Sequence, residues 1–91
     1  MSTKTEEKAR TLALTDEVLK FLGRLDSKPF MQVAVAIFQL VRDPRPHDSK
    51  QLKGSPYYRV DASEFRVVYR FDEGTVYVAV AGKRNDSEVY R

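Results

Sequence analysis

The sequence contains no cysteine and no tryptophan, and its only histidine is His47. Without cysteine it forms no disulfide, no thiolate metal site and no thiol nucleophile, so a modest hydrophobic core must hold the fold together. A single imidazole without a second ligand at metal spacing predicts no metal site, and we expect no cofactor. The four glycines are scattered at expected turns rather than gathered in a phosphate-binding loop, which disfavours nucleotide hydrolysis.

Long apolar runs are missing as well. No stretch approaches the ~20 residues of a transmembrane helix, and the charged start of the chain is not followed by the hydrophobic region that a secretion signal has. We therefore expect a cytoplasmic protein that does not bind membranes. Residues 1–8 are expected to be a disordered leader and residues 9–91 a single domain, because 91 residues with 42% hydrophobic content suffice for one small core.

What the sequence does contain is a regular order of apolar patterns. Alternation at Leu12 and Leu14 predicts a strand within residues 9–15, and Thr15 can cap the helix that follows. Helical spacing predicts two helices joined by a short turn, 16–25 and 29–43; the second places one apolar face at Phe30, Val33, Ala34, Ile37 and Val41. After a proline-rich loop, hairpin spacing predicts three strands with turns at 62–63 and 72–74: 57–61, 64–71 and 75–81.

Alternation along these strands gives the predicted sheet one apolar and one charged face. The helical hairpin is the available apolar surface that can cover the apolar face. The predicted fold class is therefore α+β: an N-terminal strand, a helical hairpin and a three-stranded antiparallel meander, with two helices packed on one face of a small, mostly antiparallel sheet. The charged face is left open to solvent or to a partner.

Basic and aromatic residues gather on this open face and in the segments beside it. They are Lys50 and Lys53 in the loop, Arg59 and Arg66 on the strands, and Lys83, Arg84 and Tyr90 after the last strand. Guanidinium groups suit phosphate because their planar fork donates two parallel hydrogen bonds, and a tyrosine ring can stack on a base. Charge on the solvent face of a sheet is common without any function, but together these residues favour an RNA-phosphate site.

Two motifs carry a resemblance to a known family, "LKG...YYRV...FRVVYRF" and "GKRNDSEVY". The sequence resembles the RelE family of toxins, within the RelE/ParE superfamily, from type II toxin-antitoxin systems. The resemblance implies the element order β-α-α-β-β-β and an endoribonuclease, or mRNA interferase, that enters the ribosomal A site, cuts the mRNA there and inhibits translation. It also implies a RelB-like antitoxin partner, and we expect the apolar groove between helices and sheet to accept an amphipathic antitoxin helix.

Residue by residue, the resemblance assigns Arg59 to the mRNA backbone, Arg66 to the scissile phosphate and Arg84 to the departing 5′ oxygen. Tyr90 matches the tyrosine that stacks on the nucleotide being cut. The best-studied member of the family has a lysine, proposed as general base, where this chain has Asp61. Neighbouring arginines are expected to lower the pKa of Asp61 and so weaken it as a base. The base therefore stays open among four residues: Asp61, Glu64, Lys50 and Lys53.

The expected reaction is a metal-independent cleavage in which the 2′ hydroxyl attacks its own 3′ phosphate. Two alternatives stay open beside it. One is a ParE-type inhibitor of DNA gyrase, which shares the fold but lacks the nuclease residues; the set Arg66, Arg84 and Tyr90 argues against it. The other is a degenerate toxin in which Asp61 has abolished cleavage, leaving a module that binds the antitoxin or the ribosome.

Overall fold

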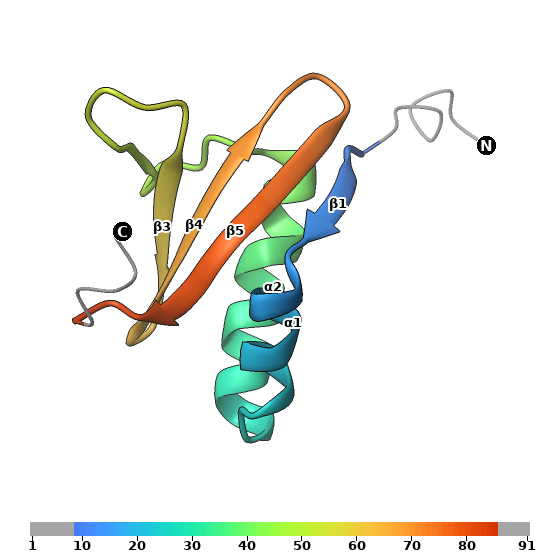
Figure 1. Cartoon of the computed structure of the whole chain (residues 1–91), viewed down its shortest axis with the longest axis vertical. Coiled ribbons are helices and arrows are strands. Elements are labelled where there is room, and N and C mark those ends of the chain that lie inside the picture. Colours follow the sequence, from blue (N-terminus) through green and yellow to red (C-terminus); the bar gives the residue numbers. More distant parts are fainter. Residues whose placement is uncertain (1–8, 86–91) are drawn as a thin grey trace.

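A computed structural model describes residues 9–85 and places two helices against a five-stranded sheet (Figure 1). The strands lie in the order β1-β5-β4-β3-β2, with β1 parallel to β5 and the other neighbours antiparallel. The elements are β1 (Thr11–Leu14), α1 (Asp16–Gly23), α2 (Ser27–Arg42), β2 (Lys50–Gln51), β3 (Tyr58–Ala62), β4 (Phe65–Phe71) and β5 (Thr75–Lys83). The predicted leader, 1–8, lies outside the described residues, and so does Tyr90.

This architecture confirms the predicted α+β fold and its order of elements. One strand was not predicted: β2 lies inside the proline-rich loop and pairs with the start of β3, with Lys50 opposite Arg59 and Gln51 opposite Tyr58. Both residues of β2 are exposed and polar, so no apolar alternation marks it in the sequence. The partner strand alone defines β2.

Helix α1 begins at the predicted cap. The Thr15 hydroxyl accepts a hydrogen bond from the Val18 amide (3.2 Å) and donates one to the carbonyl oxygen of Ala79 (3.0 Å). Ala79 lies at a bulge in β5, because the pairing with β4 passes from Val80 directly to Val78. One threonine therefore satisfies a helix end and attaches that helix to the sheet.

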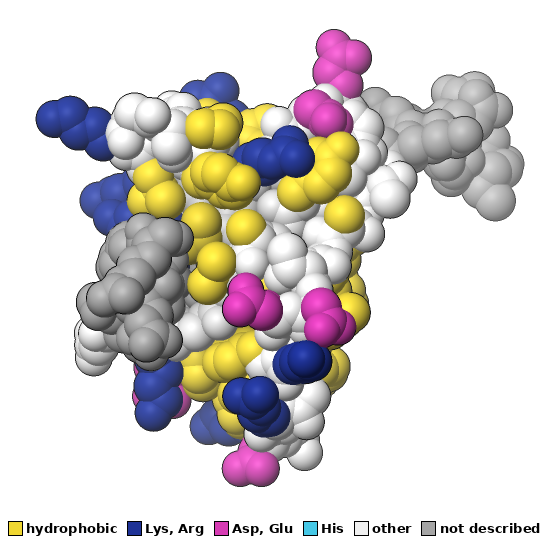
Figure 2. Space-filling model, viewed as in Figure 1, with side chains coloured by type: hydrophobic (Ala, Val, Ile, Leu, Met, Phe, Trp, Pro, Cys, Tyr) yellow, Lys and Arg dark blue, Asp and Glu magenta, His cyan; other side chains and the backbone are white. Residues whose placement is uncertain are grey.

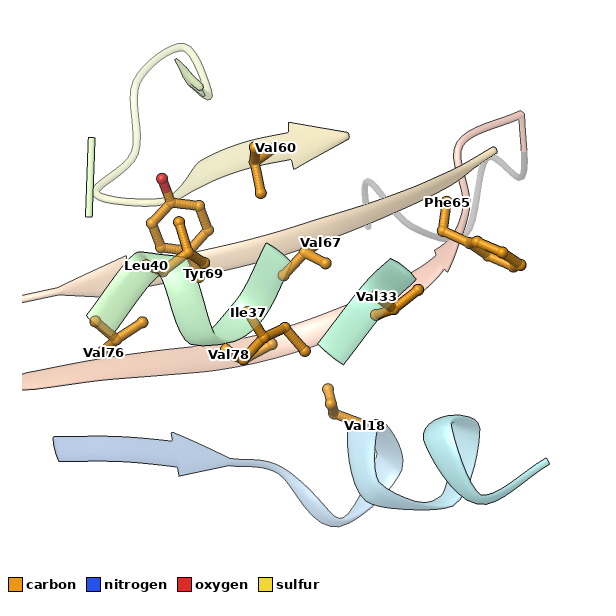
Figure 3. Close-up of a cluster of buried hydrophobic side chains, with 10 residues drawn as sticks. All are labelled: Val18, Val33, Ile37, Leu40, Val60, Phe65, Val67, Tyr69, Val76 and Val78. Atoms are coloured by element: carbon orange, nitrogen blue, oxygen red, sulfur yellow. The ribbon is translucent and has the colours of Figure 1, made fainter. Parts of the chain in front are cut away.

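The core lies between α2 and the sheet (Figure 3). Val33, Ile37 and Leu40 of α2 are fully buried against strand residues such as Val67 and Val78, and each such side chain contributes about 1.5–3 kcal/mol. The predicted face of this helix needs two corrections, because Leu40 rather than Val41 completes it and Phe30 is exposed. Figure 1 shows that the first turns of α2 extend past the end of the sheet.

The opposite face of the sheet is turned toward the reader in Figure 1, where β5 crosses in front of α2. In the same view, Lys and Arg side chains lie both at the edge of the molecule and on its face, with hydrophobic side chains between them (Figure 2). Within residues 9–85, no helix is long and apolar enough to cross a membrane.

Candidate functional site

Three strands bring candidate residues into one row across the open face. Asp61 of β3 lies opposite Arg66 of β4, and Arg66 lies opposite Gly82 of β5. The row sits where β3 turns into β4, at the lower left in Figure 1. The connecting turn is two residues long, with Ser63 at a φ of 59°, the left-handed conformation that such tight hairpin turns require. The turn thus fixes which residues face each other.

Arg84 is held beside this row by its backbone. Its amide donates a hydrogen bond to the carbonyl oxygen of Glu64 (2.9 Å), which fastens the residue after β5 to the β3–β4 turn. The sheet therefore positions Arg66, within β4, and Arg84, directly after β5, at one end of the molecule.

The carboxylate of Asp61 is where the two guanidinium groups meet. Arg66 donates two hydrogen bonds to it, Nε to Oδ1 at 2.6 Å and Nη2 to Oδ2 at 3.2 Å, and Nη1 of Arg84 lies 3.7 Å from the same Oδ2. The Arg66 side chain is only 11% exposed, whereas that of Arg84 is 51% exposed. One arginine is thus fixed against the sheet, and the other approaches from solvent.

These contacts hold the pKa of Asp61 below its usual range. The hydrogen bond from Arg66 is the largest cause; burial opposes it, and the charges of Arg66, Arg84 and Arg59 add to the lowering. This direction confirms the expectation from the sequence. Asp61 is therefore an ionised carboxylate at neutral pH, with little affinity for a further proton.

A second pair of cations lies on β2 and β3, beside the row of Asp61 and Arg66. Lys50 and Arg59 face each other directly across β2 and β3. Like charges in directly opposed positions destabilise a sheet, so this arrangement favours an anion that bridges or screens the two. Because Arg59 also lowers the pKa of Asp61, its charge reaches the row of Asp61 and Arg66.

The other predicted residues lie farther from this centre. Lys53 is exposed in the loop between β2 and β3, and Glu64 is exposed in the β3–β4 turn. Lys83 pairs with Phe65, and since directly opposed residues share a face, its side chain starts on the helix-covered side of the sheet, away from Arg66. In the described part of the chain, no group of three or more His, Asp or Glu could hold a metal ion.

A groove lies beside the row; the sequence predicted an apolar groove between helices and sheet but not its lining residues. It measures about 490 Å³ and lies between α2 and the end of β3; its lining is Met31, Gln32, Val35, Ala36, Gln39, Asp61, Ala62 and Ser63. Met31, Val35 and Phe38 are exposed apolar residues on the outer side of α2. These residues are spaced by four and three positions, so they form a second apolar stripe on a helix whose core face lies elsewhere. This spacing is visible in the sequence.

Comparison with solved structures identifies the fold. The isolated E. coli RelE toxin is 31% identical in sequence, with a TM-score of 0.72, and the match covers 90% of this chain and 92% of that one. The chain belongs to the RelE toxin family. The intact E. coli RelBE toxin-antitoxin complex is 30% identical to this RelE-family chain, with a TM-score of 0.70, and covers 82% of this chain and 96% of that one. This similarity supports a toxin role.

More distant RelE structures share the fold. The RelBE2 toxin-antitoxin complex of Mycobacterium tuberculosis is 22% identical, with a TM-score of 0.72, and covers 85% of this chain and 100% of that one. Comparison by sequence matches this RelE-family chain to no family model and to no curated protein. The resemblance of the two motifs to RelE thus agrees with the similarity in three dimensions.

Proposed function

We propose that this protein is the toxin of a type II toxin-antitoxin module and that it cleaves mRNA in the ribosomal A site. The observation that carries the proposal is the convergence of Arg66 and Arg84 on the two oxygens of one carboxylate. A phosphate offers the same pair of anionic oxygens to the same guanidinium forks. Family membership supports the toxin role, and the arginine pair supports a phosphate as the target.

In the proposed reaction, the ribose 2′ oxygen attacks the adjacent phosphorus, and the bond from phosphorus to the departing 5′ oxygen breaks. The products are a 2′,3′-cyclic phosphate, which water can open to a 3′ phosphate, and a 5′ hydroxyl that takes up a proton as the 5′ oxygen departs. Arg66, fixed by its burial, meets the charge that develops on the non-bridging oxygens, and the more exposed Arg84 reaches the departing oxygen. Fixed donors of this kind need no reorganisation as the charge develops, which is why they lower the barrier.

Tyr90 is proposed to stack on the nucleotide that is cut; it lies outside the described residues. Arg59 and Lys50 are proposed to hold the mRNA backbone beside the scissile phosphate, with Lys53 and Lys83 adding positive charge at the margins. Since ribosomes and mRNA are the substrate, the protein is proposed to act in the cytoplasm.

The general base is open among the same four residues: Asp61, Glu64, Lys50 and Lys53. A weak base suffices if the ribosome orients the attacking hydroxyl, since positioning alone can contribute on the order of 7 kcal/mol. No step in this scheme needs a metal ion. Activity on free RNA is accordingly expected to be far lower than on ribosome-bound mRNA.

The test is primer extension on mRNA in programmed 70S ribosomes with an empty A site. Wild-type protein is expected to cut within the A-site codon, and Arg84→Ala to cut roughly 100-fold or more slowly, the usual loss on removing one such donor. Arg24→Ala, an exposed arginine in the turn after α1, is the matched control and should cut at the wild-type rate.

A folded wild-type protein that makes no A-site cut would exclude the nuclease function. A DNA supercoiling assay with gyrase would then separate the two alternatives: inhibition indicates a ParE-type toxin, and its absence indicates a binding module. If wild type and Arg84→Ala cut at equal rates, Arg84 has no role in the cleavage reaction.

We further propose a RelB-like antitoxin as the partner that occupies the groove between α2 and β3. RelE structures similar to this chain include complexes with RelB, which supports such a partner. The exposed apolar side chains Met31 and Val35 line the groove, and an amphipathic helix buries its apolar face in a site of this kind.

A further inference from the structure

Asp61 occupies the position that the proposed reaction reserves for phosphate. Both of its oxygens accept hydrogen bonds from Arg66, and Arg84 approaches one of them. A carboxylate and a phosphate present the same paired acceptors to a guanidinium. The Nε–Nη2 edge of Arg66 cannot bind both anions at once, so a phosphate that binds this edge must take these two donors from Asp61.

We propose that Asp61 is a competitor for the scissile phosphate: it holds Arg66 and draws Arg84 toward the phosphate position, and RNA must displace it before cleavage. The inference rests on the proposed function in one respect, that Arg66 and Arg84 bind RNA phosphate. It assigns Asp61 a different role from general base.

The surroundings of Asp61 fit displacement. Its side chain is 33% exposed, three times the exposed fraction of Arg66, so the carboxylate moves more easily than the arginine that it holds. Asp61 also lines the groove beside α2, which offers the displaced carboxylate an open volume. Within residues 9–85, the charged groups that lower the pKa of Asp61 are Arg66, Arg84 and Arg59, and each of these cations also attracts a phosphate.

The charge of Asp61 adds to the competition. An ionised carboxylate within reach of the phosphate position repels an incoming phosphodiester, and like charges that meet at an interface cost several kcal/mol. Because the three arginines hold the pKa of Asp61 low, the carboxylate stays charged throughout the neutral range. The wild-type site is therefore expected to bind phosphate more weakly than its arginines alone would.

The test is the affinity of the free protein for a short fluorescent RNA with 2′-O-methyl groups, which cannot supply the attacking hydroxyl. Asp61→Asn removes the charge and keeps the shape, and we expect it to bind this RNA roughly tenfold or more tightly than wild type, the size that removing a close like charge gives. Glu73→Gln is the matched control: it makes the same change of net charge in the exposed β4–β5 turn, at the other end of β4. It should stay within about twofold of wild type.

Equal affinity of wild type and Asp61→Asn, including no measurable binding by either, overturns the proposal. Weaker binding by Asp61→Asn overturns it too, since Asp61 would then help Arg66 to bind RNA. An equal gain in Glu73→Gln would assign the effect to net charge and would likewise overturn it. If the Asn variant does not fold, Asp61→Ser removes the same charge and carries the same expectation.

The ribosomal assay separates this role from that of a base. If Asp61 is a competitor, Asp61→Asn should lower the KM for A-site cleavage. If Asp61 is the general base, the same variant should lower kcat by at least roughly 100-fold. A wild type that binds RNA more weakly than Asp61→Asn but makes no cut leaves the competitor role standing and removes the nuclease. If the wild type cuts but Asp61→Asn binds RNA no more tightly, the nuclease function stands and the competitor role of Asp61 is overturned.

Discussion

At the scale of single residues, Tyr69 shows how a buried polar group stabilises the scaffold of the site. Its side chain is fully buried between α2 and β4, and its hydroxyl donates a hydrogen bond to the carbonyl oxygen of Pro44 (2.6 Å). This bond attaches the start of the loop that carries Lys50 to the strand that carries Arg66. Burial raises the pKa of Tyr69 to about 12, so the hydroxyl stays protonated and remains a donor.

Tyr69→Phe is expected to lower the free energy of unfolding at pH 7 by about 1–2 kcal/mol, because the Pro44 carbonyl oxygen loses its donor in the interior. The raised pKa makes this contribution pH-dependent. It is complete below the ordinary tyrosine pKa of 10.0 and is lost as the pH rises toward about 12. Urea unfolding at pH 7 and pH 11 should show the gap between wild type and variant narrowing.

Tyr77→Phe is the matched control, since its hydroxyl makes only a long contact with Asp72 (3.4 Å) at the surface. It should change stability by less than about 0.5 kcal/mol. A gap between wild type and Tyr69→Phe that is the same at both pH values would show that the hydroxyl does not stabilise the fold through its protonated form.

At the scale of elements, the bulge in β5 and the N-terminal cap of α1 are joined by one hydrogen bond. The extra residue in β5 is Ala79, whose carbonyl oxygen accepts from the Thr15 hydroxyl. The same strand continues to Gly82 and Lys83, so the bulge attaches the helix to the strand whose far end reaches the site. A bulge also increases the local twist of a sheet, which affects how the end of β5 meets β4.

Thr15→Ala is expected to cost about 1–2 kcal/mol of stability, because both the cap and the bond to Ala79 disappear. Thr15→Ser keeps the hydroxyl and should retain most of the stability. Thermal or urea unfolding of the three proteins checks this. If Ser destabilises as much as Ala, the β-branched methyl group, not the hydroxyl, is what matters at this position.

At the scale of the whole molecule, the proposed RNA face and the proposed partner groove are separate surfaces that meet at Asp61. The arginines lie on the open face of the sheet, and the groove lies between α2 and β3. Val35→Asp is therefore expected to weaken binding of the cognate antitoxin by at least about tenfold, as loss of an apolar interface centre does, and to leave A-site cleavage unchanged. Isothermal titration and primer extension measure the two effects.

Leu19→Asp is the control for this variant. Leu19 is 52% exposed on α1, close to the 46% of Val35, and does not line the groove. Its variant should bind the antitoxin within about threefold of wild type. Equal losses in the two variants would contradict the groove as the docking site, and so would unchanged binding in Val35→Asp.

Much of the fold follows from local patterns. Alternation gave β1, β3, β4 and β5, helical spacing gave α1 and α2, and Thr15 caps α1 as predicted. The residue pairing across the β3–β4 hairpin could not be predicted from these local patterns. With the turn predicted at residues 62–63, Asp61 would face Glu64; with the turn at Ser63 and Glu64, it faces Arg66. Shifting a turn by one residue moves the partner by two, and no local signal separates these registers.

The sequence by itself determined the class of fold, the order of the elements that alternation and helical spacing mark and, through two motifs, the resemblance to RelE-type toxins. These depend on the periodicity of neighbouring residues, which is local. Only the tertiary structure decided that Lys50 faces Arg59, that Asp61 holds Arg66, and that Asp61 lies between the open face and the groove. Those contacts join segments whose pairing is set by turns and by packing over the whole core, so they exist only once the sheet has formed.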